Sequence, residues 1–431
     1  MNNDVFLSPG FKRSRISYIL NAAFDYCAVL AISGVFLTKL LVYIGLSDAQ
    51  IGILNSVTSF AFLFQLLSIG IVRFMKNSKL VSVVVMTLSH IFFMASFFVP
   101  FLAVSRLAKM IIVVVLYVLA YILRSVVSGI WSKWANSFVS PDNRGEYSAV
   151  KEIISLITGV LFTLALGYIV DGYIKGNDIE GSFVFLGITI LVFNIANFIS
   201  LVLMEKEYVV TSQEKQNRKS LKEVISNTLG NKSFTNLVIL SVLYQIATYF
   251  TLGFISVYTV KELALSVVTI QVINAVSIIA RILVTRPFGK FADKTSFATA
   301  INLALLISAV GYAINMFATP STWWVYAVYA VLNSVAASGL TQNMSNVYYS
   351  YVESDYLVQA TSINSSIGGI VGFGAALIAS EIVDAIQANG NMIFGCHIYA
   401  QQVLSGISAL LFLAATIFCH KVIRKQKVMK Q

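Results

Sequence analysis

The sequence predicts an all-α polytopic membrane protein with twelve transmembrane helices in two pseudo-symmetric six-helix bundles. Hydrophobic residues make up 58% of the 431 residues and charged residues only 11%, whereas a soluble protein carries about 25% charged residues. Apolar stretches of about 18 residues or more recur along the whole chain, which is typical of membrane-spanning helices. A polar segment in the middle of the chain and a pattern shared by its two halves indicate a duplicated unit.

The apolar stretches define the twelve candidate spans. Most of them are long enough to cross a hydrocarbon core of about 30 Å at a rise of about 1.5 Å per residue. The shortest, 266–286, contains Arg281 near its end. The candidate spans are residues 16–40, 49–72, 80–104, 110–135, 148–170, 182–204, 235–258, 266–286, 297–318, 323–347, 358–381 and 397–420.

One long polar segment, 205–234, separates six spans from six. We therefore expect an N-terminal six-helix bundle at 1–204, a cytoplasmic linker at 205–234, and a C-terminal bundle with a basic cytoplasmic tail at 235–431. Within the linker, a short surface helix is expected around Leu221–Leu229. The halves also share a pattern, because Ile51–Val57 (IGILNSV) recurs as Ile270–Val276 (IQVINAV).

The basic residues predict the orientation in the membrane. Most of the 30 Lys and Arg residues fall in the N-terminal segment, in alternate loops, in the linker and in the C-terminal tail. Because cytoplasmic loops carry an excess of Lys and Arg, we expect a multi-pass protein of the cell (inner) membrane with both termini in the cytoplasm. The net charge of +11 does not form one patch, so we expect contacts with membrane lipids and no nucleic-acid partner.

Motifs for catalysis or for a bound group are missing from the sequence. Cys27, Cys396 and Cys419 have neither disulfide-framework nor metal-ligand spacing. No Gly-rich loop with a Lys could hold a nucleotide phosphate. We therefore expect no enzyme activity, no metal, no cofactor and no drive by ATP, and we expect the protein to act as a monomer.

Asp25 and Arg124 are the two charges deepest in the apolar stretches. A charge at the bilayer centre costs about 3 kcal/mol or more, and such residues usually face protein or water. Counted from the expected cytoplasmic ends of their spans, Asp25 lies about 14 Å deep and Arg124 about 17 Å deep. The two side chains could therefore pair. Either Asp25 takes up a proton, or Arg124 binds an anionic or polar solute group and releases Asp25; alternatively, the pair only fixes two spans.

Polar and aromatic residues within other spans are candidates for solute binding. Amides bind hydroxyl-rich or zwitterionic solutes, and aromatic rings provide an apolar wall. The same amides could instead join neighbouring helices. His90 is expected to pack or hydrogen-bond at a helix contact, and a role in proton handling is the less favoured interpretation. The candidates are Asn21, Tyr26, Asn55, Gln65, Tyr244, Gln245, Tyr249, Asn274, Arg281, Asn333 and Asn343.

Three short motifs resemble those of the major facilitator superfamily. Gly289–Lys294 (GKFADK) looks like the loop signature G-x-L-A-D-[RK], and Pro141-Asp-Asn-Arg144-Gly145 is similar to the pattern before span five. Arg124, followed by Gly129, is similar to the R-x-x-x-G motif of span four. Together with the twelve spans and the middle linker, the resemblance covers almost the whole chain. It implies gating roles for Gly289, Asp293, Lys294, Arg144 and Gly145.

The resemblance implies a secondary active transporter that works by alternating access around a site near the membrane midplane. We expect it to move a small polar solute, sugar-like or a small organic anion. Protons are the expected coupling partner, and symport follows if Asp25 titrates. Two alternatives stay open. One is efflux of amphipathic compounds, and the other is a transporter-like receptor or assembly factor that binds without flux.

Overall fold

The computed structural model describes residues 8–65, 77–139, 144–206, 232–349, 357–393 and 395–426. Helices dominate this part of the chain, and eleven of them are long and apolar enough to cross a membrane. The predicted all-helical polytopic fold is confirmed. The predicted span 49–72 is described only up to residue 65, and 207–231 of the linker, including Leu221–Leu229, lies outside the described residues.

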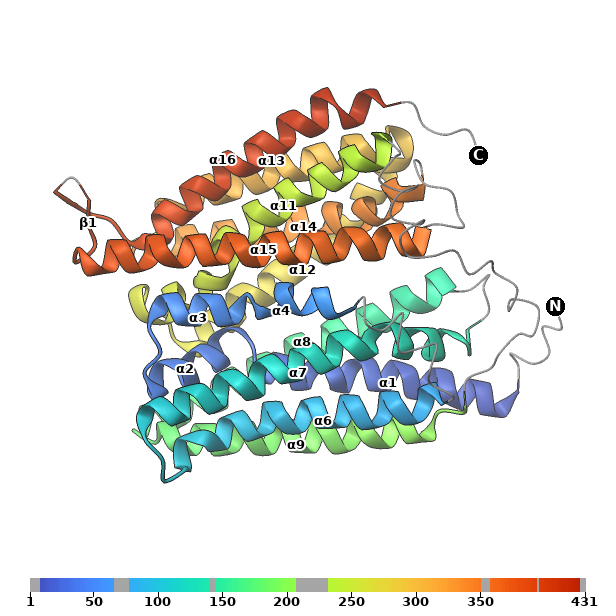
Figure 1. The fold of residues 1–431 in the computed structure, drawn as a ribbon, viewed down its shortest axis with the longest axis horizontal. Coiled ribbons are helices and arrows are strands. Elements are labelled where there is room, and N and C mark those ends of the chain that lie inside the picture. The colour runs from blue at the N-terminus through green and yellow to red at the C-terminus, as the bar shows by residue number, and fades with distance from the viewer. Residues whose placement is uncertain are drawn as a thin grey trace. The chain divides into compact units, whose positions relative to one another are not determined.

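Contacts between residues divide the chain into two compact units. The first unit comprises Met1–Leu46 and Phe64–Gln216, and the second comprises Ser47–Leu63 and Asn217–Gln431. The later boundary between the units falls between Gln216 and Asn217, and Ser47–Leu63 groups with the second half of the sequence. Figure 1 shows that the long helices within each unit run roughly alongside one another.

In the first unit, α1 and α2 form one apolar stretch that is interrupted at Ile32 and Ser33. Gly34, which opens α2, has a φ of +52°, a value that glycine adopts without steric cost. Side-chain caps help to set where helices begin: Ser8 accepts a hydrogen bond at the start of α1 and Ser105 at the start of α7. The elements are α1 (Pro9–Ala31), α2 (Gly34–Ile44), α6 (Ser78–Phe98), η3 (Val99–Phe101), α7 (Arg106–Asn136), α8 (Arg144–Lys175) and α9 (Ile179–Leu203).

The second unit contains further long helices and one short hairpin. In the hairpin, Met392 pairs with His397 and Ile393 with Cys396 in antiparallel register. The elements are α3 (Asp48–Asn55), α4 (Val57–Ala61), η2 (Phe62–Phe64), α11 (Lys232–Val257), the π-helix η6 (Tyr258–Glu262), α12 (Val267–Lys294), α13 (Phe297–Asn315), α14 (Trp324–Tyr349), α15 (Leu357–Ala388), β1 (Met392–Ile393), β2 (Cys396–His397), α16 (Ala400–Lys421) and η8 (Ile423–Lys425).

The two units repeat the same helix pairings. In the first, α6 packs on α7 and α9, while α1 packs on α8 and α9. In the second, α13 packs on α14 and α16, while α11 packs on α15 and α16. These helices correspond to one another in chain order. The repeated pairing supports the duplication that the Ile51–Val57 and Ile270–Val276 patterns indicate.

The helix α3 packs on α11 and α15, and α4 packs on α15; Figure 1 shows α3 and α4 next to α15. The approach to α11 is close, because a Cβ built on Gly253 would overlap the backbone oxygen of Gly52. Asn55 reinforces this contact, because its Nδ2 donates to the Gly253 carbonyl at 2.9 Å and to Ser256 Oγ at 3.0 Å. Small residues and interhelical hydrogen bonds are the usual means of joining membrane helices.

The end of α12 differs from the prediction. The sequence predicts a span at 266–286 followed by a loop at Gly289–Lys294, but α12 continues through this segment to Lys294, with Pro287 inside it. The apolar stretch ends near Arg286, whereas the helix does not, because its backbone hydrogen bonds form within the segment itself and do not depend on an apolar environment. Asp293 and Lys294 are exposed at this helix end.

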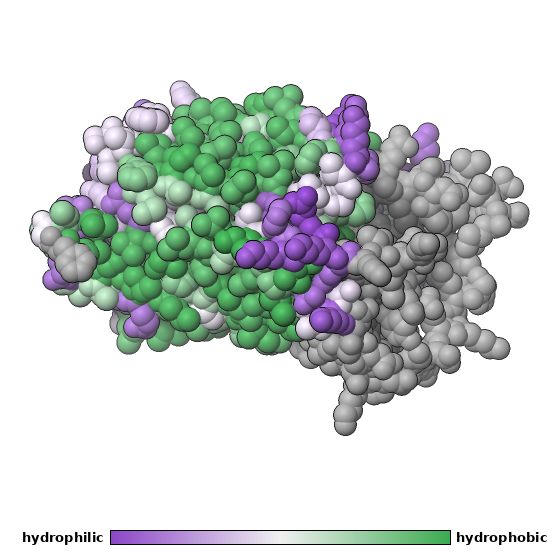
Figure 2. Space-filling view, turned by 90° about the horizontal axis from the view of Figure 1, so that it is seen from above, coloured by the Kyte–Doolittle hydropathy of each residue, from purple (hydrophilic) through white to green (hydrophobic). Residues whose placement is uncertain are grey.

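The surface of the described residues is as apolar as a lipid environment requires. Large apolar side chains are exposed along the long helices, including Leu107, Leu161 and Leu283 at 66%, 65% and 69% exposure. Figure 2 shows apolar residues over most of the coloured surface, with hydrophilic residues gathered into separate patches. In water such a surface would drive association, so it belongs against lipid.

Candidate functional site

Asp25 of α1 and Arg124 of α7 form the ion pair that their depths predict. Arg124 Nη1 donates to Asp25 Oδ1 at 2.7 Å, and Nη2 donates to Oδ2 at 2.6 Å. Both carboxylate oxygens are therefore held by one guanidinium. Such two-pronged, charge-assisted contacts are among the strongest hydrogen bonds in proteins, and they fix the orientation of both groups.

The pair is mostly buried but not sealed. The exposed fraction is 20% for the Arg124 side chain and 18% for the Asp25 side chain. A charged side chain facing hydrocarbon is costly, and such residues turn towards protein or a water-filled cavity. Part of each side chain is thus not covered by protein, while the rest depends on the partner charge.

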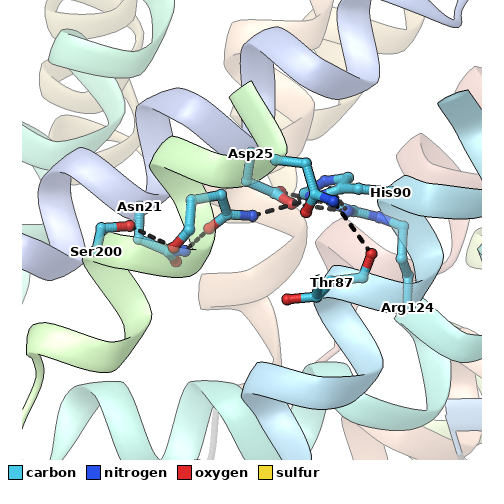
Figure 3. Close-up of polar contacts among 8 residues, drawn as sticks. Asn21, Asp25, Thr87, His90, Arg124 and Ser200 are labelled. Carbon is cyan, nitrogen blue, oxygen red and sulfur yellow. Dashed lines mark hydrogen bonds and ion pairs between the residues drawn. The ribbon is translucent and has the colours of Figure 1, made fainter. Parts of the chain in front are cut away.

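His90 of α6 contacts both members of the pair (Figure 3). Its Nε2 lies 3.0 Å from Asp25 Oδ1 and 3.2 Å from Arg124 Nη1, and its side chain is 0% exposed. The sequence predicts a histidine that packs or hydrogen-bonds at a helix contact, and the structure shows such a contact. The sequence does not predict that His90 contacts the charged pair, because apolar periodicity does not reveal how three helices are rotated about their axes.

Two amides of α9 complete the surroundings of His90. Its Nδ1 lies 3.3 Å from Asn194 Oδ1 and 3.2 Å from Asn197 Nδ2. Asn21 of α1 donates in turn to Asn197 Oδ1. Four helices, α1, α6, α7 and α9, are thereby joined through one polar network within the first unit. Asn21, a predicted solute-binding residue, is fully buried in this network.

The other predicted site residues of the first unit lie outside this network or at its edge. Tyr26 of α1 is half-buried and packs where a Cβ on Gly159 of α8 would lie. Gln65 follows η2 and is half-buried. Arg144 and Gly145 open α8, and their side chains are outside the described part of the protein.

In the second unit, Gln245 and Tyr249 lie one turn apart on α11 and face α15, where they adjoin Gly368 and Gly372. Tyr244 instead packs edge-on against Phe412 of α16, with ring centroids 6.1 Å apart. Arg281 lies close enough to Tyr244 for its charge to act on the phenol. Gln245 and Tyr249 therefore face one neighbouring helix, and Tyr244 faces another.

The predicted amides of the second unit have different surroundings. Asn55 joins α3 to α11, as described above. Asn343 donates to the Gly339 carbonyl of its own helix at 2.6 Å and is 2% exposed, while Asn274 contacts Gln271 at 3.4 Å. Asn333 is half-buried on α14 near Gly311 of α13. For Asn55, the hydrogen bonds match the alternative in which amides join neighbouring helices, whereas Asn343 bonds within its own helix.

The fold and the charged network define the class of protein: a polytopic helical membrane protein of two repeated units with a partly accessible ion pair in one of them. The chain belongs to the Major Facilitator Superfamily, whose sequence profile matches residues 16–424. It is therefore a membrane transporter for a small molecule and not an enzyme.

Solved structures of this superfamily share the fold at low sequence identity. A mutant of the nucleoside transporter NupG has a TM-score of 0.71 and 14% identity over 94% of this chain and 99% of its own. The D-xylose-proton symporter has a TM-score of 0.70 and 13% identity over 97% and 100%. The human organic anion transporter MFSD10 (TETRAN) has a TM-score of 0.59 and 14% identity over 96% and 100%. No curated protein matches the chain.

Proposed function

We propose that the protein is a proton-coupled symporter that moves a small polar solute, sugar-like or a small organic anion, by alternating access. The observation that carries this proposal is the two-pronged Asp25–Arg124 pair, with 18% and 20% of the side chains exposed. From the distribution of Lys and Arg, we propose that it lies in the cytoplasmic membrane with both termini in the cytoplasm. We also propose that it acts as a monomer.

The coupling follows from charge balance. In the structure, Arg124 and Asp25 neutralise each other. An anionic solute group that binds the guanidinium releases the carboxylate and leaves one excess negative charge in a medium that disfavours it. An uncharged polar group that binds there leaves the carboxylate without its cation, which the same medium also disfavours. Uptake of one proton by Asp25 removes the uncompensated carboxylate charge in either case. Solute and proton are then bound together, and neither occupies the site favourably without the other.

The solutes named for the structural neighbours belong to the class of solute proposed for this protein. The names of these neighbours describe a nucleoside transporter, a D-xylose-proton symporter and an organic anion transporter. The amide and aromatic residues around α11, Gln245 and Tyr249 among them, offer hydrogen bonds and an apolar wall of the kind that such solutes use. Identities of 13–14% transfer the fold and leave the solute to experiment.

A thermal-shift screen of the purified protein at pH 6 and pH 8 tests the proposal. The probes are D-xylose, uridine, lactate and D-gluconate, because ligands that bind the native state raise its apparent stability. We expect one of them to stabilise the native protein and the R424Q control, which changes an exposed Arg of the C-terminal segment. R124Q should lose that shift. Equal stabilisation of R124Q would remove Arg124 from solute binding.

Transport assays then separate the alternatives. Uptake of the stabilising probe into proteoliposomes along a proton gradient supports symport. Binding without counterflow or net flux would favour a receptor or assembly factor, and extrusion of amphipathic dyes with no response to the four polar probes would favour efflux.

A further inference from the structure

We propose that His90 is the buried carrier of the coupling proton and that Asp25 passes the proton to it. This inference rests on the proposed symport and names the group that stores the proton. It draws on an arrangement that a purely structural histidine does not need: each ring nitrogen of His90 faces one hydrogen-bond donor and one acceptor.

The Nε2 atom faces the charged pair. It lies 3.0 Å from Asp25 Oδ1, an acceptor, and 3.2 Å from Arg124 Nη1, a donor. The Nδ1 atom faces α9, where Asn194 Oδ1 is the acceptor at 3.3 Å and Asn197 Nδ2 is the donor at 3.2 Å. A neutral imidazole has one N–H and one lone pair, so only two of these four contacts form at one time.

The amide orientations follow from the other contacts of each side chain. Asn197 Oδ1 accepts from Asn21 Nδ2, which turns Asn197 Nδ2 towards His90. Asn194 Nδ2 points at the Thr87 carbonyl, 3.5 Å away, which turns its Oδ1 towards His90. Asn197 therefore presents a donor at Nδ1 and Asn194 presents an acceptor.

Every protonation state of His90 is accommodated. With the proton on Nε2, His90 donates to Asp25 and accepts from Asn197. With the proton on Nδ1, it donates to Asn194 and accepts from Arg124. The imidazolium donates to Asp25 and Asn194 at once. No state leaves a ring nitrogen unpaired, so the ring escapes the cost of about 1–3 kcal/mol for a buried unsatisfied polar group.

The transfer itself needs only these atoms. A solute on Arg124 frees Asp25, which binds a proton from water on its accessible side. The Asp25 O–H bond then breaks, and a new N–H bond forms at Nε2 of a His90 that carries its other proton on Nδ1. The products are the Asp25 carboxylate and the His90 imidazolium. Because 18% of the Asp25 side chain is exposed and none of the His90 side chain is, the proton enters at Asp25 and is stored on His90.

Among the described residues, few other ionisable groups surround His90. Asp25 comes from α1 and Arg124 from α7, and Tyr121 of α7 is close enough to act on the Arg124 charge. Tyr117 and Tyr121 also pack around Phe93, the neighbour of His90 one turn along α6. The α9 residues at the ring are uncharged amides. A protonation change at His90 is therefore sensed mainly by the Asp25–Arg124 pair.

Nitrogen NMR of the ring tests the proposal without a known solute. The chain has three histidines, and the other two, His397 and His420, are exposed. An H397N/H420N protein in lipid nanodiscs, labelled with 15N-histidine, reports on His90 alone. In the native protein, where Arg124 holds Asp25, we expect both neutral tautomers to contribute. In R124Q, which frees Asp25 as a bound solute would, we expect the imidazolium to appear. A single neutral tautomer in both proteins would overturn the proposal.

Two shape-conserving variants provide a matched pair. N194L removes the acceptor at Nδ1, so it should shift the neutral ring towards the Nε2–H tautomer. N197L removes the donor at Nδ1, so it should shift the ring towards the Nδ1–H tautomer. Shifts in opposite directions support the network, and equal spectra for both variants contradict it.

Proton-linked uptake of D-xylose, uridine, lactate or D-gluconate separates this inference from the proposed function. Proton-linked uptake by a protein whose His90 keeps one tautomer leaves symport intact and overturns the role of His90. An imidazolium in R124Q without proton-linked uptake of the probe that stabilises the native protein overturns both.

Discussion

Arg124 holds both carboxylate oxygens of Asp25, one with each terminal nitrogen, at 2.7 and 2.6 Å. Each charge is therefore the main compensation for burying the other. Removing one partner leaves the other charge buried without compensation. This single change is therefore more destabilising than removing both charges together.

We expect D25N and R124Q each to lower the melting temperature of the purified protein, and the D25N/R124Q double variant to recover part of the loss. Breaking a fully buried pair costs about 3–5 kcal/mol, and the partial exposure of this pair reduces the figure. Thermal unfolding in one detergent measures all three variants. Losses that simply add in the double variant would show that the two side chains are not coupled.

The sequence predicts this pair because two quantities follow from residue positions alone. These are the cost of a charge within an apolar span and the depth of each residue along its helix. It does not predict that His90, Asn194 and Asn197 join the pair. Their contacts depend on how α1, α6, α7 and α9 are rotated about their axes. Helices that are apolar on nearly all sides have no distinct polar face, so the sequence does not show which face points inwards.

The grouping of Ser47–Leu63 with the second unit is a second feature that the sequence does not reveal. The repeat of Ile51–Val57 as Ile270–Val276 indicates two halves and favours a boundary at the linker. The contact depends instead on Gly52 and Gly253, whose missing side chains let two backbones meet. Likewise, residue type alone does not separate structural amides such as Asn55 from solute-binding ones.

The Gly253 contact yields a stability prediction. Because a Cβ at Gly253 would overlap the backbone oxygen of Gly52, G253A should force α3 away from α11 and destabilise the protein by about 1–3 kcal/mol, as overpacking does. G374A is the matched control, since nothing lies within 4 Å of a Cβ there. In helix α15 it should be neutral or stabilising by up to about 1 kcal/mol. Equal melting temperatures for both variants would contradict the close approach.

The α3 helix is also held by charge. Asp48, in its first turn and 5% exposed, accepts from Lys261 and, at 2.7 Å, from Gln387 Nε2. K261M should cost more stability than D48N, because K261M leaves a buried carboxylate without its cation, whereas D48N leaves a Lys that is 40% exposed and can turn to water. We expect a difference of about 1 kcal/mol or more. Thermal unfolding at low salt, with the exposed Lys425→Met as control, measures it; a larger loss for D48N would reverse this ranking.

Accumulation of the stabilising probe in proteoliposomes under an imposed proton gradient tests most directly whether Asp25 couples solute to proton. The native protein should concentrate the probe when the lumen is alkaline and stop when the gradient is collapsed. D25N should lose this accumulation and keep counterflow, because exchange of solute for solute needs no net proton movement. Unchanged gradient-driven accumulation by D25N would contradict the account.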